Sequence, residues 1–456
     1  MEKVVSFIRE NRERYVADLV EFLRIPSISS SARHNQDTER CARFVADLMR
    51  KAGLQRTEIF RTLGHPIVYG ACCNAPGRPT VLVYGHYDVQ PVDPLELWTS
   101  PPFEPAVRNG EIYARGAADD KGQVYIHIAA VEAHLKRNGR LPVNVKFLVE
   151  GEEEVGSENL GKFVDTHREM LRSDVVLISD TAMFQRGVPS ICYGLRGLSY
   201  FQIDLRGSST DLHSGSFGGA VANPAQVLAQ ILASMKDRNG RVTIPGFYKD
   251  VRPLTARERK EFKRLPFSDK KYARGIGAPA LAGEKGYSTL ERTWVRPTFE
   301  VNGILAGFTG EGAKTVIPAV AMAKVSMRLV PDQSPDRIGK LFERHLKKIC
   351  PRTVEMKVTR MHGGQPWMAS MDHPAIQAAA KAFEKGFGKR PVYTREGGSI
   401  PVVATFADVL KVPSVLMGIG VPDENAHAPN EKLVLENFHG GILSSAHFLD
   451  LLGRGA

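Results

Sequence analysis

Four short apolar runs in this chain each lead to a side chain that can bind a metal ion. Their lengths of five to seven residues and their aliphatic composition are typical of buried β-strands. Open α/β sheets place their active sites beyond the carboxyl ends of their strands, so we expect these side chains to meet at one edge of a sheet. The runs are residues 81–85 before His86, residues 143–149 before Glu150, residues 175–179 before Asp180, and residues 414–420, which a short loop connects to His427.

Up to about residue 195, the predicted strands alternate with predicted helices. The spacing of apolar residues indicates helices over residues 3–24, 38–52 and 125–136. This βαβα order predicts an α/β fold with a mostly parallel sheet and helices on both of its faces.

The pattern changes near residue 196. Strands of alternating polarity and two helices indicate a compact α+β insertion, with two strand–helix units that cover one face of a sheet. We therefore predict a discontinuous domain of residues 1–195 and 365–456, interrupted by residues 196–364. Residues 247–297 are basic and poorly periodic, and the sequence does not decide between helices and a mobile loop. The insertion has predicted strands over residues 198–206, 316–330 and 354–361 and predicted helices over residues 224–235 and 334–349; helix 374–387 and strand 413–419 follow it.

The composition narrows the class of protein. The chain has 456 residues and a net charge of +11, but its basic residues form no long block and accompany no nucleic-acid motif. We therefore expect an enzyme with a basic surface and no nucleic-acid partner. The sequence has no apolar run long enough to cross a membrane, and its N-terminus does not resemble a signal peptide. Five scattered cysteines without a CxxC pair predict reduced thiols and a cytoplasmic location.

Each candidate ligand also has a structural explanation. A lone histidine such as His86 more often has a structural role, although Asp88 lies on the same strand face and can hydrogen-bond its second ring nitrogen. The pair Asp119-Asp120 either binds a metal or begins the helix that follows. The acidic run of residues 152–154 is either a solvated surface or a site in which one carboxylate binds metal and another stays free as a base. Asp180 is either a ligand or the first exposed residue of a loop.

Taken together, these positions favour a metal site. Two histidines and three or four carboxylates at strand ends are enough for two metal ions that share one carboxylate. Nitrogen and oxygen ligands without a thiolate suit zinc, manganese or cobalt.

Several motifs resemble those of a metal-dependent exopeptidase family, and the match extends over essentially the whole chain. The family includes cytosolic non-specific dipeptidase, carnosinase, carboxypeptidase G, succinyl-diaminopimelate desuccinylase and aminoacylase, and the dipeptidase branch is the most similar. The motifs are Gly85-His-Tyr-Asp-Val-Gln-Pro91, Arg115-Gly-Ala-Ala-Asp-Asp-Lys-Gly122, Glu150-Gly-Glu-Glu-Glu-Val-Gly-Ser157, Ser179-Asp180 and Ala426-His-Ala-Pro-Asn-Glu-Lys432. Those that resemble the dipeptidase branch are Asp211-Leu-His-Ser-Gly215, Gly312-Ala-Lys-Thr-Val-Ile-Pro318, Arg328-Leu-Val-Pro331, His362-Gly-Gly and Arg395-Glu-Gly-Gly-Ser-Ile-Pro401.

The resemblance implies two divalent metal ions per subunit, Zn²⁺ or Mn²⁺ with Co²⁺ as a further option. Asp119 would bridge the two ions. His86 and Asp180 would complete one site, and Glu154 and His427 would complete the other.

The resemblance also implies the catalytic groups. Glu153 takes the position of the general base that activates water for attack on the peptide carbonyl, and Asp88 would orient His86. His213, in the insertion, would donate to the oxyanion in the active site of the partner subunit. The residue before the base is often apolar in the family, whereas this chain has Glu152. That carboxylate either raises the pKa of Glu153 or points to solvent, and we expect the second.

We expect substrate selection to rest on recognition of a carboxylate. Arg328, at the end of a predicted strand, can clamp a carboxylate with two parallel hydrogen bonds, although a surface salt bridge is the alternative. Thr315, His362, Ser399 and the backbone of Gly398 resemble further anchors.

The resemblance thus implies a dipeptidase that cleaves dipeptides or short peptides with a free C-terminal carboxylate. The alternative within the family is a deacylase or desuccinylase that acts on N-acyl amino acids. The inserted domain would act as a lid and join two subunits into a homodimer.

Overall fold

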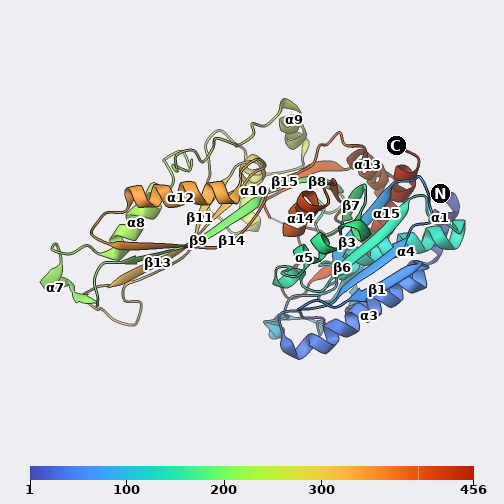
Figure 1. Ribbon diagram of the computed structural model, residues 1–456, viewed down its shortest axis with the longest axis horizontal. Helices are drawn as coiled ribbons and strands as arrows, with labels where there is room; N and C mark the ends of the chain where they lie inside the picture. Colours follow the sequence, from blue (N-terminus) through green and yellow to red (C-terminus); the bar gives the residue numbers. More distant parts are fainter. Residues whose placement is uncertain (399, 456) are drawn as a thin grey trace. The chain divides into compact units, whose positions relative to one another are not determined.

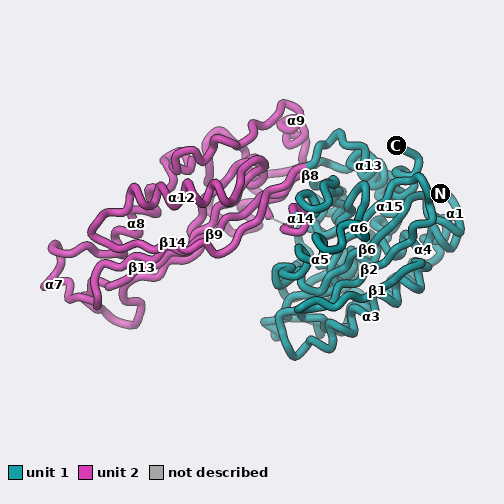
Figure 2. The backbone as a smooth tube through the Cα atoms, viewed as in Figure 1, with its two compact units in different colours: residues 1–193, 369–394, 405–456 teal, residues 194–368, 395–404 magenta. Residues whose placement is uncertain are grey.

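The structure, a computed structural model, describes residues 1–398 and 400–455 (Figure 1). The chain forms two compact units (Figure 2): unit 1 contains residues 1–193, 369–394 and 405–456, and unit 2 contains residues 194–368 and 395–404. The sequence pattern did not indicate that residues 395–404 group with unit 2. No helix of the described residues has the length and apolar character needed to cross a membrane.

The four strands that precede the candidate ligands are neighbours in the central sheet of unit 1. They lie in the order β6-β3-β7-β17, and all three pairings between them are parallel. Antiparallel strands flank them, with β1 and β2 beyond β6 and β8 beyond β17. The predicted α/β class is confirmed, and its parallel part is the centre of the sheet. These strands are β1 (Arg56–Phe60), β2 (Ile67–Cys72), β3 (Thr80–His86), β6 (Asn144–Glu150), β7 (Val175–Ile178), β17 (Ser414–Leu416) and β8 (Ser190–Leu195).

Helices cover both faces of this sheet, as the sequence predicted. On one face, Gly85 of β3 lets helix α4 (Lys121–Asn138) approach, since a Cβ there would lie 2.8 Å from Val124. On the other face, the ring of the preceding residue, Tyr84, packs edge-on against Phe406, with 5.4 Å between ring centroids. Close packing on both faces explains why the central strands are apolar throughout. The remaining helices of unit 1 are α1 (Glu2–Glu10), α2 (Arg12–Leu23), α3 (Asn35–Ala52), α5 (Leu160–Thr166), α6 (Arg168–Leu171), α13 (Pro374–Phe387), α14 (Pro401–Val409), which continues from unit 2, and α15 (Leu435–Gly453).

Helix α4 is longer than predicted, and its N-terminus carries the Asp119-Asp120 turn. It starts at Lys121, and every residue from there to His134 is buried. The ammonium group of Lys121 donates to the carbonyl oxygens of Phe22 at 3.2 Å and Ile25 at 2.6 Å, which compensates for its burial. A helix buried on all sides lacks the amphipathic spacing on which the prediction rested, so its first turn was missed.

Two predicted elements are interrupted. The helix expected over residues 3–24 is two helices, because Asn11 leaves the helical conformation (φ −104°, ψ 15°) and its side-chain amide donates to the carbonyl of Phe7. The strand expected over residues 316–330 is β12 (Val316–Ile317) and β13 (Val320–Leu329). Pro318 lies between them and has no backbone N–H to donate to a sheet.

Unit 2 is built on a four-stranded antiparallel sheet in the order β11-β13-β9-β14. Helices α8 and α12 cover one face, where Phe201 and Phe342 pack with ring centroids 5.1 Å apart. Edge strand β11 was not predicted, and residues 247–297 contain three short helices. The elements are β9 (Gly197–Arg206), β11 (Thr298–Ala306), β14 (Glu355–Gly364), α8 (Pro224–Ser234), α12 (Pro335–Ile349), α9 (Ala256–Arg264), α10 (Asp269–Gly275) and α11 (Thr289–Trp294).

Candidate metal centre

The carboxyl ends of the central strands of unit 1 bring the predicted ligands together. His86 is the last residue of β3, and Asp180 follows β7 by two residues. Glu153 and Glu154 lie in a 3₁₀ turn shortly after β6, and Asp119 lies just before helix α4. The parallel arrangement of these strands places their carboxyl ends at the same edge of the sheet.

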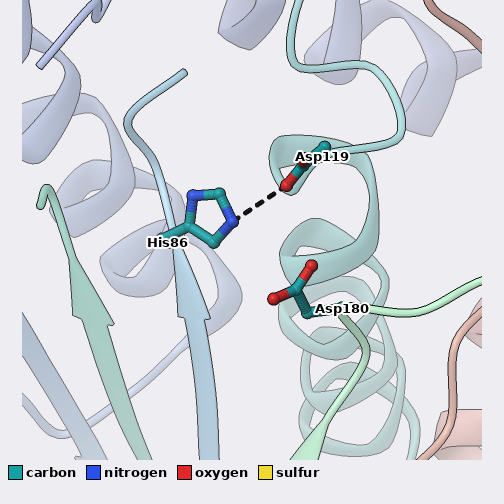
Figure 3. A group of neighbouring side chains, drawn as sticks. All are labelled: His86, Asp119 and Asp180. Carbon is teal, nitrogen blue, oxygen red and sulfur yellow. Dashed lines mark ion pairs between the residues drawn. The ribbon is translucent and has the colours of Figure 1, made fainter. Parts of the chain in front are cut away.

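The first group of side chains consists of His86, Asp119 and Asp180 (Figure 3). One possible ligand atom from each lies within 4.8 Å of the others. His86 Nε2 lies 3.0 Å from Asp119 Oδ1, and Asp180 points toward the same space. Burial and the negative charges of Asp119 and Asp120 raise the pKa of Asp180 well above its usual value. A cation bound among these groups would stabilise the charged carboxylates.

The second group consists of Asp119, Glu154 and His427. His427 Nε2 lies 2.9 Å from Asp119 Oδ2 and 3.1 Å from Glu154 Oε2. Asp119 therefore belongs to both groups and presents one oxygen to each histidine. Burial by itself would raise the pKa of Asp119, but the facing imidazoles of His427 and His86 outweigh it and hold that pKa below its usual range.

The surroundings of His86 fit a metal ligand. Its Nδ1 lies 3.1 Å from the backbone carbonyl oxygen of Asp88, so the N–H of the neutral ring is placed at Nδ1. Nε2 faces Asp119 Oδ1 at 3.0 Å, and in the neutral ring it would carry the lone pair that a metal ion needs. An imidazole lone pair and carboxylate oxygens facing one another, without thiolate, suit a divalent cation such as zinc or manganese.

Asp88 contacts His86 differently from the prediction. The backbone carbonyl, rather than the side chain, receives the Nδ1 proton, while the carboxylate Oδ1 lies 3.4 Å from that nitrogen. The carboxylate accepts hydrogen bonds from the backbone N–H groups of Glu153 at 3.3 Å and Glu154 at 3.1 Å. Asp88 thus holds the Glu153 turn beside the end of β3. Burial raises the pKa of Glu153 to about 7.

Glu152 does not point to solvent, so that expectation was wrong. Its side chain is buried and accepts hydrogen bonds from the backbone N–H of His65 at 3.1 Å and from the amide of Asn159 at 2.8 Å. Gly64 makes room for this contact, since a Cβ there would lie 1.5 Å from Glu152 Oε1. The carboxylate holds two loops in place, and only the fold brings these loops to it.

Gln123 helps to hold the turn of Asp119 in place, a role that was not predicted from the sequence. Its amide nitrogen donates to the carbonyl of Ala118 at 2.9 Å, and its amide oxygen accepts from the backbone N–H of Ile419 at 2.8 Å. It therefore ties the turn of Asp119 to the loop after β17. In the sequence, the only indication of this role was that Gln123 is a polar side chain next to the apolar residues of helix α4.

His213 and the predicted substrate-binding residues that the structure describes lie in unit 2. His213 is exposed in strand β10 (Leu212–His213), its Nδ1 accepts from the backbone N–H of Gly215, and its partner strand β12 adjoins Thr315. Arg328 is half-buried on β13, and His362 on β14 stacks on Tyr200 with ring centroids 4.9 Å apart. Gly398 is exposed, and Ser399 lies outside the described residues.

Arg196, which was not predicted, lies next to one of the predicted substrate anchors. Its guanidinium donates to the carbonyl oxygen of Gly397 at 3.2 Å, next to the predicted anchor Gly398. Burial and the positive charge of Arg328 lower the pKa of Arg196 to about 10.

Comparison with known proteins shows which family has a similar sequence. Residues 82–450 match the family described as Peptidase family M20/M25/M40. The chain is 36% identical over 459 residues to the Cys-Gly metallodipeptidase dug1 of Schizosaccharomyces pombe, covering 97% of this chain and 96% of that one. It is 31% identical to the Beta-Ala-His dipeptidase of Homo sapiens, covering 99% and 92% of the two chains.

A solved structure agrees with this assignment. The M20 family metallo-carboxypeptidase Sso-CP2 from Sulfolobus solfataricus superposes with a TM-score of 0.85 at 34% identity, covering 96% of this chain and 99% of that one. The sequence match extends over most of the chain, and the fold agrees over nearly all of it. The chain therefore belongs to peptidase family M20/M25/M40.

Proposed function

We propose that this protein is a metallodipeptidase that hydrolyses dipeptides or short peptides with a free C-terminal carboxylate. The observation that carries the proposal is the pair of ligand groups that share Asp119. The similarity to a Cys-Gly metallodipeptidase and to a Beta-Ala-His dipeptidase supports the substrate class.

The two ligand groups are proposed to hold two divalent ions, Zn²⁺ or Mn²⁺ with Co²⁺ as a further option. His86 and Asp180 would hold one, Glu154 and His427 would hold the other, and Asp119 would be shared by both. Such ions supply an activated water nucleophile and polarise the scissile carbonyl. The role of this chain is to hold the ligands close together, with His86 fully buried and His427 exposed at the edge of the cluster.

Glu153 is proposed as the general base. It lies next to the ligand Glu154, and its backbone N–H is fixed by the carboxylate of Asp88 at 3.3 Å. It accepts a proton from the attacking water and delivers it to the leaving amine. Burial raises the pKa of Glu153, which favours its holding the proton until the leaving amine takes it.

The residues of unit 2 are proposed to select the substrate. Arg328 binds the terminal carboxylate, because a guanidinium can donate two parallel hydrogen bonds to it. Further anchors are Thr315, His362, Ser399 and the backbone of Gly398. Unit 2 is proposed to act as a lid and to join two subunits into a homodimer, in which His213 donates to the oxyanion in the partner's active site.

We also propose a cytoplasmic location. Within the described part of the chain, Cys41, Cys72, Cys73 and Cys350 form no disulfide. Unpaired thiols are typical of proteins in a reducing compartment.

Steady-state kinetics with a small substrate panel test the proposed function. The panel contains Ala-Ala, Cys-Gly, β-Ala-His, an N-blocked peptide and N-acetyl amino acids, each assayed after chelation and after return of Zn²⁺ or Mn²⁺. We expect hydrolysis of unblocked dipeptides that a chelator abolishes and a metal restores. Preference for N-acetyl amino acids would identify a deacylase, and preference for the N-blocked peptide would identify a carboxypeptidase. Activity that survives chelation would contradict the metal mechanism.

A further inference from the structure

A second buried carboxylate, Glu431, lies four residues after His427 in the same loop. It is fully buried in unit 1, and both of its oxygens accept hydrogen bonds. Oε1 accepts from the backbone N–H groups of Ala118 at 2.9 Å and Asp119 at 3.1 Å. Oε2 accepts from the backbone N–H of Gly116 at 2.9 Å and from the guanidinium of Arg115 at 2.8 Å. One side chain thus accepts hydrogen bonds from three backbone N–H groups of a single turn.

These bonds connect two loops: one carries Asp119, the ligand shared by both groups, and the other carries His427. The turn of residues 115–119 ends in Asp119, and the loop of residues 425–431 contains His427. The backbone carbonyl of Glu431 also accepts from the N–H of Ala114 at 3.1 Å. The distance of 2.9 Å between Asp119 Oδ2 and His427 Nε2 therefore depends on two loops that Glu431 connects directly.

The chemistry of this contact requires a carboxylate. Four donors point at two oxygens, and a charged carboxylate offers enough lone pairs to accept from all of them. An amide at the same place would turn an NH₂ group toward two N–H donors and lose both bonds. Arg115 supplies the positive charge that a buried carboxylate needs, and its other nitrogen donates to the carbonyl of Pro91 at 2.9 Å.

We propose that Glu431 is a positioning residue that sets the separation of Asp119 and His427 and thereby the affinity for metal. It touches neither substrate nor the reacting atoms. This inference rests on the proposed function, since it assumes that the two side chains share an ion. Residues that orient metal ligands in this way typically contribute about 10- to 100-fold to metal affinity.

The test compares Glu431→Gln with Glu284→Gln in the full-length protein. Glu284 is also a buried carboxylate that accepts from an arginine, Arg296, at 2.7 and 2.8 Å, but it belongs to unit 2. The first measurement is the titration of chelator-treated protein with Zn²⁺ by calorimetry. The second is amide hydrogen exchange of peptides that cover residues 114–120, also in chelator-treated protein, which reports on the turn independently of activity.

We expect Glu431→Gln to weaken Zn²⁺ binding by about 10- to 100-fold and to accelerate exchange in residues 114–120. Glu284→Gln should change neither result, even if it lowers the melting temperature. Unchanged Zn²⁺ affinity in folded Glu431→Gln would overturn the inference. If that variant does not fold, Glu431→Asp keeps the charge beside Arg115 but is too short to reach the whole turn, and it should show the same two effects. Failure of both variants to fold would assign the carboxylate to folding and would also overturn the inference.

The wild-type arm separates this inference from the proposed function. If wild-type protein binds no Zn²⁺, the metal mechanism itself is wrong. If wild-type protein binds two ions and Glu431→Gln binds them equally well, only the positioning role is wrong.

Discussion

The imidazole of His127 is completely buried between two hydroxyl groups next to the candidate metal centre. Its Nε2 lies 2.9 Å from Ser179 Oγ, and its Nδ1 lies 2.9 Å from Ser445 Oγ. Ser179 Oγ also lies 2.6 Å from the carbonyl oxygen of Met417, to which it donates its proton. His127 therefore donates from Nε2 to Ser179 and accepts at Nδ1 from Ser445. A neutral ring with one tautomer satisfies this network, which holds Ser179 directly before Asp180.

This burial makes stability depend on pH. Desolvation lowers the pKa of His127 to about 3, whereas a histidine in the unfolded chain has a pKa near 6.5. Between these values the unfolded chain binds more protons than the folded one, so stability is present above about pH 6.5 and is lost as pH falls toward 3. From pH 7 to pH 5, His127 should remove about 2 kcal/mol from the free energy of unfolding.

We expect the difference in free energy of unfolding between wild type and His127→Gln to shrink by that amount over this range. Urea unfolding at both pH values, with metal kept constant, measures it. Ser445→Ala removes one hydrogen bond but keeps the imidazole, so its cost should change less with pH. An equal difference at pH 7 and pH 5 would contradict the prediction.

At the scale of elements, the packing of helix α4 against the turn before it decides where Asp119 lies. Gly122, in the first turn of the helix, has no room for a side chain. A Cβ there would lie 2.1 Å from the carbonyl oxygen of Ala117 and 2.6 Å from Leu433. The carbonyl belongs to backbone and cannot rotate away, so any side chain must displace the turn.

We expect Gly122→Ala to lower the free energy of unfolding by about 1–3 kcal/mol through overpacking. The control is Gly161→Ala in helix α5, where no described atom lies within 4 Å of the added Cβ. It should raise stability by up to about 1 kcal/mol, because alanine is the better helix former. Urea unfolding of both variants gives the comparison, and a change of the same sign in both would argue against the packing explanation.

At the scale of the whole molecule, the candidate metal ligands belong to unit 1, whereas His213 and the substrate anchors belong to unit 2. The proposed mechanism needs both units. If His213 acts across a dimer, each complete active site takes its ligands and base from one chain and His213 from the other.

Mixed dimers test this division. Glu153→Ala should reduce hydrolysis of dipeptides at least about 100-fold and keep its metal content, because only the base is lost. His213→Ala should also be inactive. An equal mixture, refolded or exchanged so that dimers form at random, should recover about a quarter of wild-type activity, since half of the dimers are mixed and each has one complete site. No recovery, with mixed dimers verified by mass spectrometry, would exclude action in trans.

Several features of the fold and site could be predicted because they depend on local sequence. An apolar run that ends in His86 or Asp180 identifies both a buried strand and the side chain at its carboxyl end. The alternation of strands and helices then places these ends at one edge of a sheet. The same reasoning found helix α4 but missed its first turn, because the helix is buried on all sides there and has no polar face to set its period.

Contacts between segments far apart in the chain were decided only by the tertiary structure. Glu152 was expected to face solvent because an acidic run usually does, yet residue His65, 87 positions away, buries it by donating a hydrogen bond. Glu431 bonds to Gly116 across 315 positions, and no spacing in the sequence indicates that pairing. The sequence by itself determined which residue types end the central strands, because strand and ligand are neighbours in the chain. The fold decided which buried carboxylates position those ligands, because a hydrogen bond depends on distance in space, not along the chain.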